Sequence, residues 1–224
     1  MLAPYILVVS AAVMLGLAFW IGGAGRARGE LARYLVAWLA LSVAASLIMA
    51  ASMWVGDETV SLSFAAAARS LVMIAVFVVF VFTRSFSRAS DYTLFFWSVP
   101  LQLGLAVNIL NWERIYRVEH GAWVLNLGDS LAVAAVLVEW FYSILAVFYA
   151  ALLYLTLRRE GRAEESRRTL AMTVALLVLL AAGSVRGVAS GIFGRAVNAG
   201  YAGYLAGVLL LVWAFRQPPV PGES

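Results

Sequence analysis

Seven apolar stretches, each long enough to cross a lipid bilayer, occupy nearly the whole of this 224-residue chain. A bilayer core of about 30 Å needs about 20 apolar residues per helix. Backbone groups in lipid must find partners within the chain, which favours helices as the spanning form. The sequence therefore predicts an all-α fold, a polytopic seven-transmembrane-helix bundle with spans at Leu2–Ile21, Leu31–Trp54, Val60–Thr83, Leu94–Trp112, Leu131–Leu157, Thr169–Ser190 and Ala196–Phe215.

Composition supports this class and limits the chemistry. Hydrophobic residues make up 64% of the chain and charged residues 12%, whereas soluble domains are about one quarter charged. The chain has no cysteine, no lysine and a single histidine, His120. We expect no cofactor, because a retinal Schiff base needs a lysine, and haem or zinc needs more histidine or cysteine ligands. Catalytic side chains do not cluster along the sequence, so we expect the chain not to be an enzyme.

The arginines predict the orientation of the chain. Most of them follow the first, third, fifth and seventh spans, while Arg114, Arg117 and Arg195 lie on the opposite side. The positive-inside rule then puts the N-terminus outside and the C-terminus in the cytoplasm. The first span has its positive charges after it, so we expect a retained helix and no cleaved signal peptide. We expect one transmembrane domain, residues 1–216, with a proline-rich cytoplasmic tail at 217–224, in the cell membrane and specifically a bacterial inner membrane.

The loop after the fifth span mixes arginines with glutamates. With a net charge of +4, the basic residues are better explained as anchors to anionic membrane lipid than as a nucleic-acid site. We interpret the loop as a helical extension of the two adjoining spans. Its partner would be lipid head groups or a cytoplasmic signalling protein, contacted by Arg158, Arg159, Arg162, Arg167 and Arg168.

The longest segment on the predicted outer side is Glu113–Ser130. Apolar and polar residues alternate from Ala122 to Leu127, after Gly121, which predicts a short hairpin or an interfacial cap. The alternative is a lid over an outward-facing pocket, since long ordered loops are often functional.

Glycines recur at helical spacing in the last two predicted spans. Such faces let helices approach closely. We expect the two faces to pack together, through Gly183 and Gly187 on one span and Gly200, Gly203 and Gly207 on the other.

Two ionisable side chains lie deep within the predicted spans. Arg69 and Glu139 are each about ten residues in from the outer end of their spans, or roughly 15 Å deep. A lone charge at that depth would cost several kcal/mol or be neutralised. Small residues surround both positions, so we expect the two side chains to form an ion pair in the bundle interior.

We hypothesise a polar pocket in the outer half of the bundle, with this pair as its floor. Pro100 in the fourth span would free a backbone carbonyl for another partner. The pocket would hold two arginines, Arg69 and Arg186, and one carboxylate, that of Glu139. This excess of positive charge would favour a small anionic or zwitterionic ligand. The alternative is that the pair is structural and binds nothing. The predicted ligand-binding residues are Arg69, Gln102, Glu139, Tyr142, Arg186, Tyr201 and Tyr204.

Three parts of the sequence resemble a known family. They are the stretch from Gly121-Ala122-Trp123 through Leu131, the following span, and the pairs Arg158-Arg159 and Arg167-Arg168. They resemble the seven-transmembrane N-terminal sensor regions of bacterial histidine kinases over about 50 residues by local pattern. The resemblance implies sensing of an outer or membrane-borne stimulus and signalling through a cytoplasmic module. No kinase module follows the seventh span in this sequence, so we expect output through a separate partner.

These observations favour a receptor-like or sensory membrane protein. One alternative is a small transporter or permease that uses Arg69 and Glu139 for substrate or proton coupling. Another is a non-catalytic subunit of a membrane complex. Inward of the pair, the third and fifth spans become aromatic and aliphatic, which argues for a one-sided pocket and against a transport path.

Overall fold

A computed structural model describes residues 3–23, 30–86, 94–119, 122–184 and 199–216 of the chain. The described elements are α-helices and one antiparallel pair of short strands. In chain order they are α1 (Ala3–Gly23), α2 (Glu30–Trp54), α3 (Glu58–Phe86), α4 (Leu94–Leu110), α5 (Trp112–Ile115), β1 (Tyr116–Glu119), β2 (Ala122–Leu125), α6 (Ser130–Arg159), α7 (Ala163–Ser184) and α9 (Ala199–Arg216).

Five of the described helices are long and apolar enough to cross a membrane. They are α1, α2, α3, α6 and α7, which correspond to the first, second, third, fifth and sixth predicted spans. α4 lies at the fourth predicted span as a shorter apolar helix of 17 residues. α9 lies at the seventh, with 18 residues. These helices identify the chain as an α-helical, multi-pass membrane protein.

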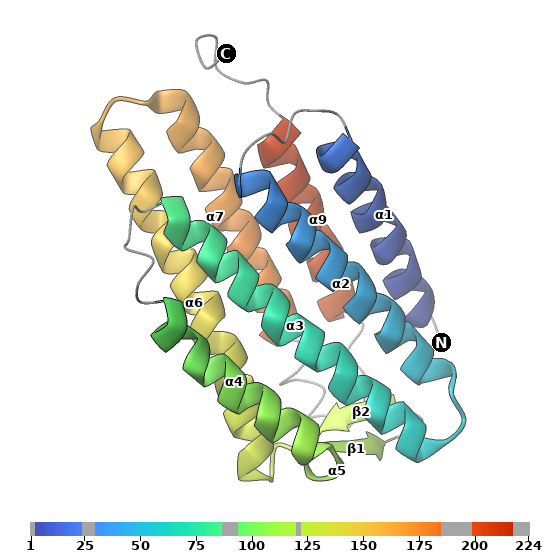
Figure 1. Cartoon of the computed structure of the whole chain (residues 1–224). Helices are drawn as coiled ribbons and strands as arrows, with labels where there is room; N and C mark the ends of the chain where they lie inside the picture. Colours follow the sequence, from blue (N-terminus) through green and yellow to red (C-terminus); the bar gives the residue numbers. More distant parts are fainter. Residues whose placement is uncertain (1–2, 24–29, 87–93, 120–121, 185–198, 217–224) are drawn as a thin grey trace.

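The helices lie side by side, with the two strands at one end of the bundle, here called the hairpin end (Figure 1). α1, α2, α3, α6, α7 and α9 each pack against the next, and α9 packs back against α1. These six helices therefore enclose a common core. α4 packs on the outside, against α3 and α6, and its remaining face is exposed.

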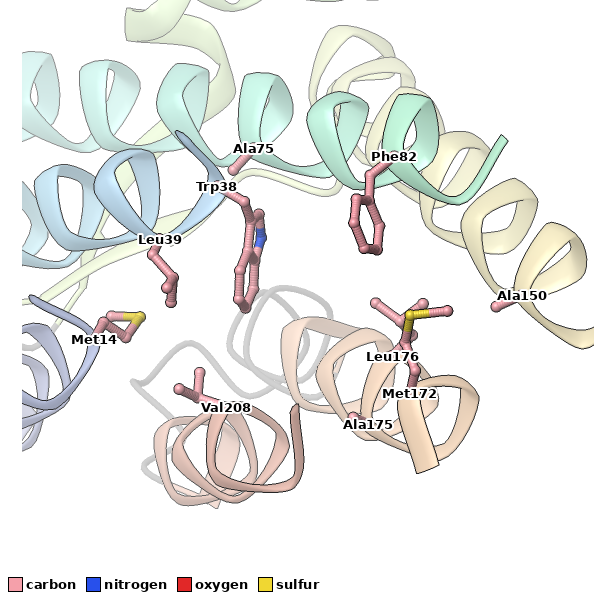
Figure 2. Close-up of a cluster of buried hydrophobic side chains, with 10 residues drawn as sticks. All are labelled: Met14, Trp38, Leu39, Ala75, Phe82, Ala150, Met172, Ala175, Leu176 and Val208. Atoms are coloured by element: carbon pink, nitrogen blue, oxygen red, sulfur yellow. The ribbon is translucent and has the colours of Figure 1, made fainter. Parts of the chain in front are cut away.

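The largest apolar cluster takes side chains from all six enclosing helices (Figure 2). Trp38 of α2 and Phe82 of α3 extend toward α7 and α9, and both are about 95% buried. Lipid tails are as apolar as these side chains, so close packing holds such helices together more than the hydrophobic effect does. The other members are Met14, Leu39, Ala75, Ala150, Met172, Ala175, Leu176 and Val208.

Glycines allow α9 to approach α7 closely, as the sequence predicts. A Cβ added at Gly203 would lie 3.0 Å from the Cβ of Ala182. One added at Gly207 would lie 2.7 Å from the Cγ of Leu179 and 3.3 Å from the backbone oxygen of Ala175. The predicted packing of the two helices is therefore confirmed at Gly203 and Gly207. The prediction is wrong for Gly183, which faces Glu139 of α6 and not α9. Gly187 lies outside the described residues, and nothing is described around Gly200.

A tight turn joins α6 to α7 at the end opposite the hairpin. Gly161 follows the last turn of α6 with a φ of +76°, which is costly for residues that carry a Cβ. The N–H of Gly161 donates to the Arg158 carbonyl (3.3 Å), and the N–H of Arg162 donates to the Leu157 carbonyl (3.0 Å). These two bonds form a Schellman cap. Because α7 begins at Ala163, the arginine-rich loop is a helical extension of both spans, as predicted.

Residues 116–119 and 122–125 fold as a hairpin, one of the two forms that the alternation in the sequence predicts. β1 and β2 pair antiparallel, with Tyr116 opposite Leu125. Ile115, Tyr116 and Leu125 are all at least 99% buried. They pack against α3 and α6 in a cluster with Leu62, Ala65, Ala66, Ala132 and Val136. In this structure the hairpin is thus part of the core at its end of the bundle.

Asp129 links the hairpin segment to α6. Its side chain caps the helix by accepting from the Leu131 N–H at 2.9 Å. The guanidinium of Arg114 donates to the same carboxylate, with its Nε at 3.1 Å and its Nη2 at 3.0 Å. The cap supplies a partner for a backbone donor that would otherwise be left free at the helix start.

We expect Gly207→Ala to destabilise the bundle by about 1–3 kcal/mol, because the new Cβ overpacks the α7–α9 contact. Thermal unfolding in detergent, compared with the wild type, measures this. Gly16→Ala in α1 is the matched control, since nothing lies within 4 Å of its added Cβ. Equal melting temperatures for both variants would contradict the close approach of α7 and α9.

We also expect stability to depend on the ionisation of Asp129. The Leu131 N–H first, and Arg114 in addition, hold the pKa of Asp129 below its ordinary value of 3.8. The ionised carboxylate therefore stabilises the fold above that value, and this contribution is lost as pH falls through the lowered pKa. Melting curves between about pH 6 and pH 3 should show the loss in the wild type and a flatter profile in Asp129→Asn. Parallel profiles for the two proteins would refute the assignment.

Candidate functional site

α3 buries Arg69 because its neighbours on the helix are small. Ala65 and Ala68 are fully buried, and Ala66 and Ser70 are at least 91% buried. Small side chains let the adjacent helices come close while leaving space for one long side chain. Arg69 fills that space and is itself only 8% exposed.

α6 presents Glu139 from the middle of a face of mostly small residues. That face includes Ala132, Ala135, Tyr142, Ala146 and Ala150, all at least 98% buried. The other side of the helix carries large apolar residues that are 40–57% exposed, and these are Val133, Leu137, Phe141, Ile144 and Phe148. α6 is thus divided into an inner face of small residues, as the small residues around Glu139 in the sequence indicate, and an outer face of large apolar ones.

The two charges meet as predicted. Nη2 of Arg69 lies 2.8 Å from Oε2 of Glu139, and the two side chains are 9% and 17% exposed. Coulombic attraction is strong where water is excluded, which offsets part of the cost of burying both charges. The carboxylate also faces α7, because a Cβ on Gly183 would lie 3.8 Å from its Oε1.

The guanidinium of Arg69 is not fully satisfied by this contact. Its Nε is buried and has no hydrogen-bond partner. A buried donor without a partner costs about 1–3 kcal/mol, and more on a charged group. A further acceptor oxygen at this position would therefore be stabilised strongly.

A buried polar network connects α3, α4 and the hairpin next to the pair. Asn108 of α4 donates through its Nδ2 to the Ala66 carbonyl (2.9 Å) and to Oγ of Ser70 (3.0 Å). Its Oδ1 accepts from the hydroxyl of Tyr116 at 2.6 Å. Ser70 follows Arg69 in the chain, so the network runs from the hairpin to the stretch of α3 that carries the ion pair. The role of Tyr116 was not predicted, since only the folded hairpin brings it to α4.

Tyr142 holds α4 one turn along α6 from Glu139. Its hydroxyl accepts from the Leu101 N–H (3.0 Å) and donates to the Trp97 carbonyl. A regular helix would pair that amide and that carbonyl with each other. Pro100 lies between them and disturbs the helix ladder, so the tyrosine bridges the gap. The predicted release of a backbone carbonyl near Pro100 is confirmed.

Aromatic side chains close the bundle beyond Tyr142, on the side away from the hairpin. The ring of Tyr142 contacts Phe77 edge-on at 5.2 Å and Phe80 at 5.6 Å between centroids. Phe80 in turn contacts Trp97 (5.5 Å) and Tyr149 (6.0 Å). The polar network thus ends at an aromatic layer, as the residues in these two predicted spans indicate.

The other predicted ligand-binding residues do not join the pair in the described structure. Gln102 is exposed on α4 and donates to Oγ of Ser98 on its own helix (3.0 Å). Tyr204 of α9 donates to the sulfur of Met14 at 3.7 Å, in a part of the bundle bounded by α1 and α7. Arg186 lies outside the described residues, as does the side chain of Tyr201.

A cavity of about 20 Å³ lies elsewhere, at the core cluster of Figure 2. This volume holds little more than one water molecule. Its walls are apolar and come from α2, α3 and α7, so it offers no polar recognition. The lining residues are Tyr34, Leu35, Trp38, Val79, Phe82, Met172 and Leu176.

The arginine-rich end of α6 and α7 is partly neutralised by its own glutamates. Arg162 donates from its Nε to Glu165 (2.7 Å) and lies 3.6 Å from Glu160. Arg168 pairs with Glu164 at 3.0 Å. Arg158 donates to the hydroxyl of Tyr154 (3.3 Å). Arg159 and Arg167 are exposed, so they are the most available cations of the predicted docking set.

Comparison with protein-family models, curated proteins and solved structures finds no match for this chain. Within the described residues, no three histidine, aspartate or glutamate side chains come together as a metal site requires. The chemistry of the site therefore has to be argued from its charge pair and polar network.

Replacing one partner of the ion pair should lower the stability of the fold more than replacing both. We expect Glu139→Gln and Arg69→Gln each to destabilise the protein by about 3 kcal/mol, because each leaves an uncompensated buried charge. The double variant should recover much of that loss, as measured by thermal unfolding in detergent. Arg159→Gln, at an exposed position, is the control. Additive losses in the double variant would mean that the two side chains are not coupled.

Proposed function

We propose that this chain is a receptor-like membrane protein with seven spans, its N-terminus outside and its C-terminus in the cytoplasm. α4 and α9 supply the two spans beyond the five long apolar helices, since both run within the same bundle (Figure 1). Arg114 and Arg117 lie at the hairpin end. The positive-inside rule makes the hairpin end the outer one, because the opposite end carries Arg33, Arg84, Arg158, Arg159, Arg162, Arg167 and Arg168.

The polar network that joins the hairpin to α3 next to the buried pair supports this proposal. Its hydrogen bonds pass from Tyr116 to Asn108 and on to Ser70, the residue that follows Arg69 on α3. Arg69 in turn pairs with Glu139. A change at the outer hairpin would alter how α3 and α6 are held together. α6 then continues as one helix to the arginine-rich turn, which offers the route to an inner partner.

The proposed ligand is small and anionic or zwitterionic. The buried Nε of Arg69 lacks an acceptor, and a ligand carboxylate or phosphate oxygen would supply one. Such a group would compete with Glu139 for the guanidinium, and a cationic group on the same ligand would compensate Glu139. Binding would therefore exchange one charge pair for another and shift the packing of α3 against α6.

The aromatic layer at Phe77, Phe80 and Tyr142 argues for sensing over transport. A transporter needs a polar or hydrated path on both sides of its binding site. Here the hydrogen-bonded network next to the pair stops at this layer. The inner partner of the proposed receptor would meet the exposed Arg159 and Arg167, with Arg158 beside them.

The proposal predicts a conformational response at the inner end when the pair is released. The chain contains no cysteine, so spin labels can be placed at Arg33→Cys and Glu160→Cys without background. Neutralising Glu139 by Glu139→Gln should shift the distance between these labels by roughly 1–2 Å or broaden it, as helix shifts in switching proteins do. Glu113→Gln, at an exposed position near the hairpin, should leave the distance unchanged.

The proposal is tested a second time by measuring ligand affinity. In a thermal-shift screen of small carboxylates and amino acids, any stabilising compound should bind Arg69→Gln about 10- to 100-fold more weakly, the equivalent of one charged hydrogen bond. An unchanged label distance in Glu139→Gln would leave a purely structural pair and overturn the receptor assignment. Accumulation of the compound inside proteoliposomes would establish a transporter instead.

A further inference from the structure

α4 has an exposed face with the spacing of a helix–helix seam. Its inner face packs through Leu101, Gly104 and Asn108. Residues on the exposed face are separated alternately by four and three positions, which is the repeat of a left-handed helix pair. They are Phe95, Val99, Gln102, Ala106 and Ile109, here called the Gln102 face.

Gln102 is out of place on a surface that faces lipid. It lies at the centre of α4, eight residues from each end, and its side chain is exposed. Its one hydrogen bond among the described residues uses a single N–H, which donates to Oγ of Ser98 at 3.0 Å. Lipid tails offer no acceptor or donor for the rest of the amide, so leaving it there is costly. The neighbouring exposed residues Phe96 and Leu103 are 72% and 62% exposed and apolar, as lipid contact requires.

We propose that the Gln102 face packs against the same face of a second copy of this chain. A primary amide is both donor and acceptor, so two of them can bond reciprocally. Two copies inserted in the same orientation place Gln102 at the same depth in the bilayer, across a two-fold axis along the membrane normal. An unrelated helix would need a polar side chain at the matching depth, which the second copy provides automatically.

The chemistry of this interface resembles a soluble coiled coil with one polar seam position. Val99 and Ala106 flank Gln102 along the seam, and Ala106 lets the two backbones come close. A single amide at such a position specifies the register and the number of helices. The exposed face of α4 lies away from the six helices that enclose the core (Figure 1), so a second copy can dock without rearranging them.

Disulfide crosslinking tests the face directly, because the native chain has no cysteine. The protein carrying Ala106→Cys, reconstituted in phosphatidylcholine vesicles and oxidised with copper phenanthroline, should form a covalent dimer. Leu137→Cys is the matched control, at a 57% exposed position on the outer side of α6. Equal crosslinking at both positions would show random collision and overturn the proposal.

The amide is tested by measuring association in the same vesicles. Fluorescence transfer between labelled copies, followed over a dilution series in lipid, yields the dissociation constant. Gln102→Leu should weaken association roughly 3- to 20-fold, the range for an interhelical hydrogen bond in a membrane, while Leu103→Val should change it little. Monomers at every protein-to-lipid ratio, or unchanged affinity in Gln102→Leu, would refute the interface. Thermal unfolding of each variant checks that the monomer fold is intact.

Discussion

The ion pair between Arg69 and Glu139 is the contact around which the hairpin half of this bundle is organised. Neither charge would be stable at that depth without the other. Their attraction requires α3 and α6 to lie close, and the alanines on the facing surfaces of both helices make that approach possible. The polar network and the hairpin are then built against the same stretch of α3, so the pair and its surroundings depend on one another.

The site around the ion pair is covered by the hairpin on one side and by aromatic side chains on the other. On one side, the hairpin contributes Ile115, Tyr116 and Leu125 to the core, and the Tyr116 hydroxyl reaches the network through Asn108. On the other side, the Tyr142 hydroxyl bonds to the backbone groups that are left without helical partners near Pro100, and its ring packs into an aromatic layer. The hydrogen-bonded network next to the ion pair is therefore confined to the hairpin half of the bundle. This arrangement supports the proposed one-sided recognition site.

Polar side chains on the lipid-facing surface of the bundle also need hydrogen-bond partners. Most exposed positions on α4 and α6 are large and apolar, as contact with lipid tails favours. Gln102 departs from that pattern, and the same physical rule that pairs Arg69 with Glu139 inside the bundle applies to it outside. A receptor that signals by shifting α3 against α6 could transmit that shift to a second copy, because α4 packs on both helices.

Much of this architecture could be predicted from residue order alone. Apolar length and spacing indicate the helices, alternation indicates the hairpin, and the glycines of α9 indicate close packing. The equal depth of two opposite charges even predicts the ion pair, because few arrangements can stabilise a charge in lipid. These features depend on local composition and on the thickness of the bilayer, both of which act on each helix separately.

The tertiary structure decided which polar side chains share a site. Gln102 and Tyr204 have the right depth for the predicted pocket, yet α4 turns Gln102 outward and α9 brings Tyr204 to Met14. Tyr116, from a segment predicted as a hairpin, a cap or a lid, also completes the buried network, a role that was not predicted. Depth follows from counting residues along a helix. The direction in which each helix faces depends on packing with neighbours that are distant in the chain, and only the folded bundle determines that.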